Sequence, residues 1–331
     1  MPDLPAAPVP RDALPPLPLP RSDYLIVLSW TLEGSGDIDE VCLIARRYDP
    51  DVVALGKLDA DHIDVAAQKL RMDAYPSATT PVTRHRNALF TRPAGVLNHG
   101  LNHRNANARD PRVPRVSVTF KVRSATGALE AGLFSVTSVH LSRHSPTERL
   151  LTAESLNHLP GNMCRLVVGA FNEDAVGEQE EIDHSTGPGR AHWHDRSHYV
   201  HGAGRIAATR VHEALSAQGL VDVARVVGTE EAMRPTSSVL LPADGRQAGD
   251  RDCRVYADLR TAGSVVHLEV LAGYDDVATH LPILTVLHLP TLRAGIVASS
   301  EEHSAARKRS ATERAAWKAQ RIDRERERGL R

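Results

Sequence analysis

The sequence predicts an α/β protein with a large buried core. Short apolar runs rich in β-branched residues, typical of buried strands, recur along the chain and alternate in places with helical apolar patterns. The chain has 331 residues, of which 41% are hydrophobic, which suits one large domain or two ordinary ones and excludes a disordered protein. Its formal net charge of −1 gives the whole molecule no electrostatic preference for nucleic acid.

The first strand–helix–strand unit follows a proline-rich start. Residues 24–32 (YLIVLSWTL) form an apolar run that predicts a buried strand. Residues 37–48 carry apolar side chains at helical spacing, and the pair Asp49-Pro50 predicts the end of that helix. A second apolar run at 51–58 predicts a second strand.

The middle of the chain predicts two more strands and a capped helix. A polar, His- and Asn-rich stretch at 84–112 separates the first unit from strands expected at 116–122 and 133–141. The sequence SPTE places Ser145 at the N-cap of a helix and Glu148 three residues later, which is a capping box.

The second half predicts one helix among several strands. A strand at 165–172 leads through a long loop to an amphipathic helix at 205–218, which Gly219 ends. The apolar face of that helix is expected to hold Ile206, Ala207, Val211, Ala214 and Leu215. Later strands are expected at 253–259, 264–271 and 282–289.

Both ends of the chain look like additions to one central domain, 23–295. Residues 1–22 are proline-rich, with eight of the 21 prolines in the first 20 positions, and predict a disordered, extended arm. Residues 296–331 predict a charged helix. Its last 31 positions carry ten Lys/Arg against six Asp/Glu, and a Ser299…Glu302 capping box is expected at its start. We expect either end to attach to an unidentified protein partner; a nucleic-acid partner is less favoured.

Cysteine usage and hydropathy indicate a cytoplasmic protein without a membrane partner. The three cysteines (Cys42, Cys164 and Cys253) are widely spaced and lack zinc-site spacing, which suits buried thiols in a reducing compartment. No apolar run reaches the length of a membrane span, and the start of the chain lacks a signal-peptide core. Five histidines within 184–202 could bind zinc or nickel, although the glycine and proline content favours a surface loop.

Five short polar motifs fall at the ends of predicted strands. In chain order they are Trp30-Thr31-Leu32, Gly56-Lys57, His140-Leu141, Gly169-Ala170-Phe171-Asn172 and Ala278-Thr279-His280-Leu281-Pro282. Each motif is weak alone, but their order over residues 24–290, with Arg149 soon after the third, resembles the endonuclease/exonuclease/phosphatase superfamily, which has a deoxyribonuclease I-like fold. The resemblance implies a four-layer α/β sandwich of two facing mixed β-sheets flanked by helices.

The chain departs from the family pattern at four motif positions, three of which carry an acid in the family. Members usually read W-N-L, Q-E, H-L, G-D-F-N and S-D-H-x-P. Here the substituted positions are Thr31, Lys57, Ala170 and Thr279, and the retained ones are His140, Asn172 and His280. A family Arg-Ile-Asp motif is also altered, to Arg251-Asp252-Cys253.

These substitutions bear directly on the chemistry that the resemblance implies. The family uses Mg²⁺, held mainly by the glutamate of Q-E, to cleave phosphate esters. Lys57 cannot ligate a cation, Ala170 cannot orient or deprotonate a water, and Thr279 offers a hydroxyl where a carboxylate would orient His280. We therefore expect a catalytically defective homologue that holds no metal cofactor and acts as a binding or structural component.

The retained residues and nearby acids allow alternatives for both the pocket and the function. The remnant pocket of His140, Asn172 and His280, with Lys57, could bind phosphate without a metal, or it could have become structural filling. The alternative function is an active, Mg²⁺-dependent nuclease or phosphodiesterase with rearranged ligands. Acids near the motifs that could serve are Glu33, Asp59, Glu173, Asp174, Asp275 and Asp276.

Overall fold

The computed structural model describes most of the central chain and the C-terminal helix. The described residues are 20–32, 37–78, 84–93, 95–98, 115–123, 126–129, 132–156, 163–173, 197–200, 204–207, 209–240, 247–274 and 277–327. The predicted proline-rich arm lies outside them except for its last three residues, and so do most of the histidine-rich stretch and four of the acids near the motifs.

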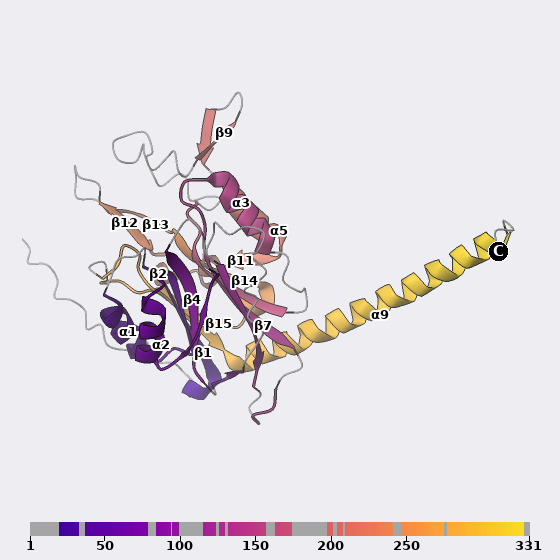
Figure 1. Ribbon diagram of the computed structural model, residues 1–331, viewed down its shortest axis with the longest axis horizontal. Helices are drawn as coiled ribbons and strands as arrows, with labels where there is room; N and C mark the ends of the chain where they lie inside the picture. The colour runs from indigo at the N-terminus through magenta and orange to yellow at the C-terminus, as the bar shows by residue number, and fades with distance from the viewer. Residues whose placement is uncertain are drawn as a thin grey trace, which may run out of the picture.

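Two six-stranded mixed sheets form the centre of the molecule (Figure 1). The first sheet has the order β15 (Val265–Val270), β16 (Ile283–His288), β1 (Tyr24–Thr31), β2 (Val52–Asp59), β4 (His85–Thr91), β3 (Asp73–Pro76). The second has the order β11 (Leu220–Asp222), β14 (Cys253–Asp258), β8 (Met163–Ala170), β7 (Leu133–His140), β6 (Arg115–Val122), β5 (Leu97–Asn98). The pairs β1–β2 and β7–β8 are parallel, and all other pairs are antiparallel.

Helices cover the outer faces of both sheets, which gives four layers. The helices α1 (Ile38–Arg47) and α2 (His62–Leu70) pack on the first sheet, and α3 (Pro146–Ser155) and α5 (Arg210–Ala217) pack on the second. The shorter helices are α6 (Val223–Val227), α7 (Glu230–Met233) and α8 (Leu259–Ala262), and a 3₁₀ turn, η1 (Arg21–Asp23), precedes β1. The four-layer sandwich implied by the sequence is confirmed.

Strand β1 shows why its apolar run is unbroken. All eight of its residues are buried because both of its faces are covered. Leu25 and Val27 point into the core between the sheets, whereas Ile26 and Leu28 point toward α1 and α2.

The predicted helix start at Ser145 is also confirmed, since its Oγ accepts a hydrogen bond from the Glu148 backbone N–H at 3.2 Å.

Two predictions for the middle of the chain are wrong. Residues 204–207, which include Ile206 and Ala207, form strand β10, which pairs with β9 (Ser197–Val200), so the helix begins at Arg210 and not at 205. The polar stretch 84–112 contains β4, whose apolar core is only a few residues long but lies between β2 and β3 in the sheet. A further two-stranded sheet joins β12 (Ser237–Leu240) to β13 (Gln247–Asp250).

The C-terminal helix begins earlier than the sequence predicts. Helix α9 (Leu289–Glu327) runs continuously across the expected boundary at 295/296, and the predicted capping residue Ser299 lies inside it, buried. Its first turns are part of the domain, because Leu289, Leu292 and Ile296 are completely buried in the core between the sheets. Beyond them the helix projects away from the sandwich (Figure 1). None of the described helices has both the length and the apolar character that crossing a membrane requires.

Candidate functional site

The polar ends of strands from both sheets meet at one edge of the sandwich. In the first sheet Thr31 pairs with Gly56, and in the second His140 pairs with Ala170, which pairs in turn with Cys253. The two sets are joined because the Cys253 thiol donates a hydrogen bond to Thr31 Oγ1 at 3.4 Å. The motifs that were recognised separately in the sequence therefore share one edge, which we call the motif edge.

Lys57 occupies a distorted position at the end of β2. The register between β2 and β4 shifts between Leu55 and Leu58, and Lys57 within this bulge has a left-handed backbone, with φ of 52°. Its backbone N–H donates to Asn87 Oδ1 at 3.1 Å, and Asn87 itself is completely buried. Sequence reasoning missed Asn87, because it lies on the strand that was not predicted.

The turn after β8 is built by a close approach of two backbones. Gly169 has φ of +132°, and a Cβ atom there would lie 1.9 Å from the carbonyl oxygen of Val139. Ala170 is completely buried in the core between the sheets, where a methyl group fits. Asn172 has φ of 53°, and its side-chain amide donates to the carbonyl oxygen of Leu141 at 2.8 Å. The turn is thus held directly against the His140-Leu141 segment.

The two retained histidines are both enclosed. His140 and His280 are each 5% exposed, and the Nδ1 atom of each ring is buried. The His280 carbonyl accepts a hydrogen bond from the Trp30 indole at 2.7 Å, which fixes the segment beside the first motif. Thr279, in contrast, is exposed, so its hydroxyl does not replace a buried carboxylate.

Thr236 is a second residue that the sequence did not indicate. Its carbonyl accepts from the Leu281 N–H at 2.7 Å, and its hydroxyl oxygen accepts from the Cys253 N–H at 2.9 Å. It therefore ties the His280 segment to the end of β14. No sequence pattern marks a lone threonine before a short strand as a bridge of this kind.

The carboxylate of Glu173, which follows Asn172, is held by buried contacts within the fold. Glu173 forms an ion pair with Arg149 at 3.1 Å, and the two side chains are 1% and 0% exposed. Its other carboxylate oxygen accepts from the Val211 N–H at 2.9 Å, which satisfies a backbone donor in the first turn of α5. Asp59, a second acid considered as a replacement metal ligand, instead pairs with His85 at 3.3 Å.

None of the residues at the five motif positions named above carries a carboxylate. Hard cations prefer several oxygen ligands, carboxylates above all. The positions aligned with the family motifs supply a hydroxyl, an ammonium, two imidazoles and an amide, at Thr31, Lys57, His140, His280 and Asn172. Within the described part of the chain, no group of three or more His, Cys, Asp or Glu side chains is placed to hold a metal ion.

Comparison with known proteins assigns the fold. No protein-family model matches the chain, and no curated protein matches its sequence. Among solved structures, an endonuclease/exonuclease/phosphatase family protein from Bacteroides thetaiotaomicron aligns with a TM-score of 0.55 at 12% identity, over 80% of this chain and 94% of that one. An AP endonuclease from Archaeoglobus fulgidus aligns with a TM-score of 0.54 at 17% identity, over 80% and 99%.

A phosphatase is similar to the same degree. A mannosyl-6-phosphatase from Bacteroides thetaiotaomicron aligns with a TM-score of 0.52 at 13% identity, over 79% of this chain and 98% of that one. The chain therefore has the fold of the endonuclease/exonuclease/phosphatase superfamily. Because nucleases and phosphatases share that fold, the substrate class is a separate question that only the site can address.

Proposed function

We propose that this chain is a catalytically defective phosphoesterase homologue whose motif edge binds a phosphate group without a metal ion. The main support for the proposal is the identity of residue 57. It is a lysine, at the strand end where the family pattern has the carboxylate that anchors Mg²⁺. An ammonium at this strand end would repel a divalent cation and attract an anion.

The charge presented to a ligand supports binding. In the family pattern, a glutamate together with Mg²⁺ offers the phosphate about one net positive charge, and Lys57 alone offers one as well. Imidazole and amide N–H groups, the types present at His140, His280 and Asn172, are donors of the kind that phosphate oxygens accept. Binding can therefore persist after the metal site has been lost.

The same residues argue against hydrolysis. Ala170 offers no group to deprotonate a water, and its side chain is buried in the core. The neighbouring carboxylate of Glu173 is held by Arg149 and the first turn of α5, so it cannot take over that role without breaking a buried ion pair. Removing one orienting carboxylate can cost roughly 10⁴ in rate in other hydrolases.

Binding is tested by titrating inorganic phosphate against wild type and Lys57→Ala by calorimetry. We expect saturable binding that weakens at least tenfold in Lys57→Ala. Lys308→Ala, which removes an exposed charge on α9, is the control and should leave the affinity unchanged. Equal affinities for wild type and Lys57→Ala at this site would refute phosphate binding by Lys57.

Catalysis is tested with bis(p-nitrophenyl) phosphate in the presence of Mg²⁺ or Mn²⁺. We expect no turnover above the background rate. Turnover that is abolished by EDTA and by His280→Ala would establish the alternative, an active metal-dependent nuclease or phosphodiesterase with rearranged ligands.

A further inference from the structure

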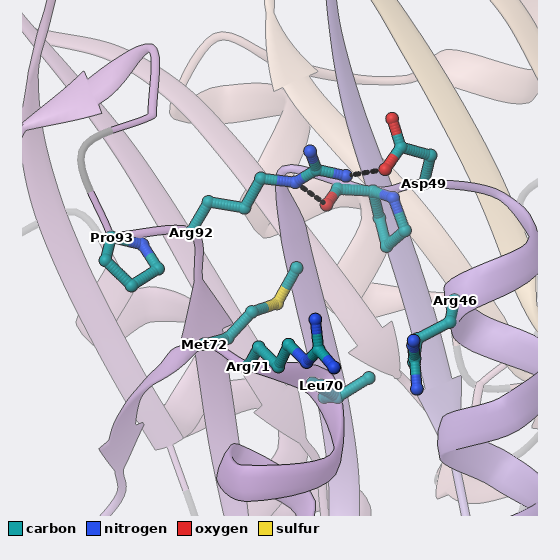
Figure 2. Close-up of a pocket in the computed structure, with 8 residues that line it drawn as sticks. Arg46, Asp49, Leu70, Arg71, Met72, Arg92 and Pro93 are labelled. Carbon is teal, nitrogen blue, oxygen red and sulfur yellow. Dashed lines mark hydrogen bonds and ion pairs between the residues drawn. The ribbon is translucent and has the colours of Figure 1, made fainter.

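A cationic pocket lies at the end of the first sheet opposite the motif edge. The cavity has a volume of about 450 Å³ and is formed by the ends of α1, α2 and β4 (Figure 2). Its lining residues are Arg46, Asp49, Pro50, Leu70, Arg71, Met72, Arg92 and Pro93, and we call it the arginine pocket. Pro50 precedes β2 and Lys57 lies near its far end, so the two sites are separated by about 20 Å at the usual rise per residue.

One wall of the arginine pocket is electrically balanced. The Arg92 guanidinium pairs with the Asp49 carboxylate and also donates to the carbonyl oxygen of Pro50 at 2.8 Å. Arg21 approaches the same Asp49 carboxylate at 3.4 Å and donates to Asp51 at 2.9 Å. Two arginines and two aspartates therefore neutralise one another and fix the shape of this wall.

The other wall carries two positive charges that are not balanced in this way. The guanidinium groups of Arg46 and Arg71 make no ion pair or hydrogen bond with any residue that the structure describes. Figure 2 shows both side chains at the hollow, with Leu70 lying near them and Met72 above. Leu70 and Met72, which are mostly buried at 7% and 8% exposed, form a small apolar floor in the pocket.

The backbone around the pocket is unusual as well. Asp49 and Arg71 have φ of 46° and 57°, in the left-handed region that favours glycine. Among the described residues only two other non-glycine positions have positive φ, and these are Lys57 and Asn172 at the motif edge. Such strain tends to persist at binding sites, where the surrounding structure holds it in place.

A simpler role for the arginines is to balance helix dipoles. Arg46 lies in the last turn of α1, and Arg71 is the C-cap of α2, where cations interact favourably with the carbonyl end of a helix. That role does not require a cavity, an apolar floor or convergence of the two side chains on one hollow. It also predicts no saturable binding of an anion, so the two roles can be separated by experiment.

We propose that the arginine pocket binds the dianionic phosphate group of a small phosphate monoester. The forks of Arg46 and Arg71 would each hold two phosphate oxygens, a geometry that guanidinium groups adopt readily with phosphate. The lining has three arginines against one aspartate, which suits a ligand with two negative charges. The apolar body of the monoester would rest on Leu70 and Met72.

Phenyl phosphate is a suitable probe, because it joins a dianion to an apolar ring. The titration is made in a Lys57→Ala background, so that the motif edge does not contribute. We expect saturable binding that is at least tenfold weaker in the R46A/R71A double variant. The control R307A/R309A removes the same charge from the exposed part of α9 and should leave the affinity unchanged.

Two further titrations test the role of the guanidinium groups and of the ligand charge. R46K/R71K retains the charge but loses the forks, so we expect intermediate affinity from a variant that preserves the local electrostatics. Phenylacetate, with the same ring and one negative charge, should bind at least threefold more weakly than phenyl phosphate. Absence of saturable binding, equal affinity in R46A/R71A, or equal affinity for phenylacetate would each overturn the proposal, whatever the result at Lys57.

Discussion

The two edges of the first sheet hold positive charge in different ways. At the motif edge, Lys57 sits in a β-bulge whose backbone is fixed by buried Asn87, among motifs tied together by hydrogen bonds. At the opposite edge, Arg46 and Arg71 are exposed residues at helix ends, and their side chains converge over an apolar floor. The first site is defined by the backbone and by buried contacts, whereas the second is defined by exposed side chains, whose replacement we expect to affect the fold little.

We therefore expect the motif edge to be most sensitive to a substitution that displaces its backbone. Gly169→Ala places a Cβ atom 1.9 Å from the Val139 carbonyl oxygen, so β7 and β8 must separate beside His140. We expect a loss of more than about 5 kcal/mol in the free energy of unfolding, or failure to fold, measured by urea denaturation.

Gly219→Ala is the matched control for that substitution. Gly219 also has positive φ, at +75°, but nothing lies within 4 Å of the added methyl group. It should cost only about 1–2 kcal/mol, the ordinary penalty of a left-handed alanine. Similar losses at both glycines would show that the close approach of the two strands is not what shapes the motif edge.

The buried ion pair gives the next largest effect. Glu173→Gln leaves the Arg149 charge buried without its carboxylate, which we expect to cost about 3–5 kcal/mol in chemical denaturation. Glu154→Gln, at an exposed position on the same helix as Arg149, should change stability by less than about 0.5 kcal/mol. A small loss at Glu173 would mean that its carboxylate is available for other chemistry.

Cys42, one helical turn before Arg46 on α1, reports on its charged surroundings. Burial, and then the charge of Asp39, raise the pKa of its thiol to about 11, while Lys69 and Arg46 lower it. Because the folded pKa lies above the unfolded value of 9.0, the thiol stabilises the fold below pH 9 and this contribution is lost as the pH rises to 11.

That loss should amount to roughly 2 kcal/mol in the free energy of unfolding. Urea denaturation between pH 8 and pH 11 should therefore show a smaller decline for Cys42→Ala than for wild type. The same pH dependence in both proteins would indicate that the thiol titrates normally.

At the arginine pocket we expect a small gain in the free energy of unfolding, whereas the substitutions at Gly169 and Glu173 are expected to lower it. Arg71→Gly relieves a left-handed backbone at the C-cap of α2, so we expect stabilisation of about 1 kcal/mol together with weaker binding of phenyl phosphate. Stabilisation without any loss of affinity would confine Arg71 to a structural role.

Much of the sandwich could be predicted from local patterns. Strands such as β1 and β7 were evident because both of their faces are buried, and the start of α3 was evident because Ser145 caps it. Strand β4 was missed because its neighbours in the sequence are polar. The sequence predicts the start of α9 too late in the chain, because its first turns are apolar and continue the apolar run of the preceding strand. In the structure these turns complete the core.

The two sites also differ in how far the sequence predicts them. The motifs at this edge were recognised because their order along the chain resembles the family pattern, and the structure places Thr31, His140, Ala170 and Cys253 on neighbouring strand ends. Asn87 and Thr236 could not be predicted, since each acts through one or two hydrogen bonds to residues distant in sequence. The arginine pocket was not predicted either, because Arg46, Arg71 and Arg92 lie in three elements and share no local pattern.

We propose that Lys57 has replaced the carboxylate that would anchor a metal ion at the motif edge. Calorimetric titration of the wild-type protein with Mn²⁺ tests this most directly, with His280→Ala as the companion variant. We predict no saturable binding of Mn²⁺ to either protein. Saturable binding to wild type that disappears in His280→Ala would contradict the claim and restore a metal centre to this edge.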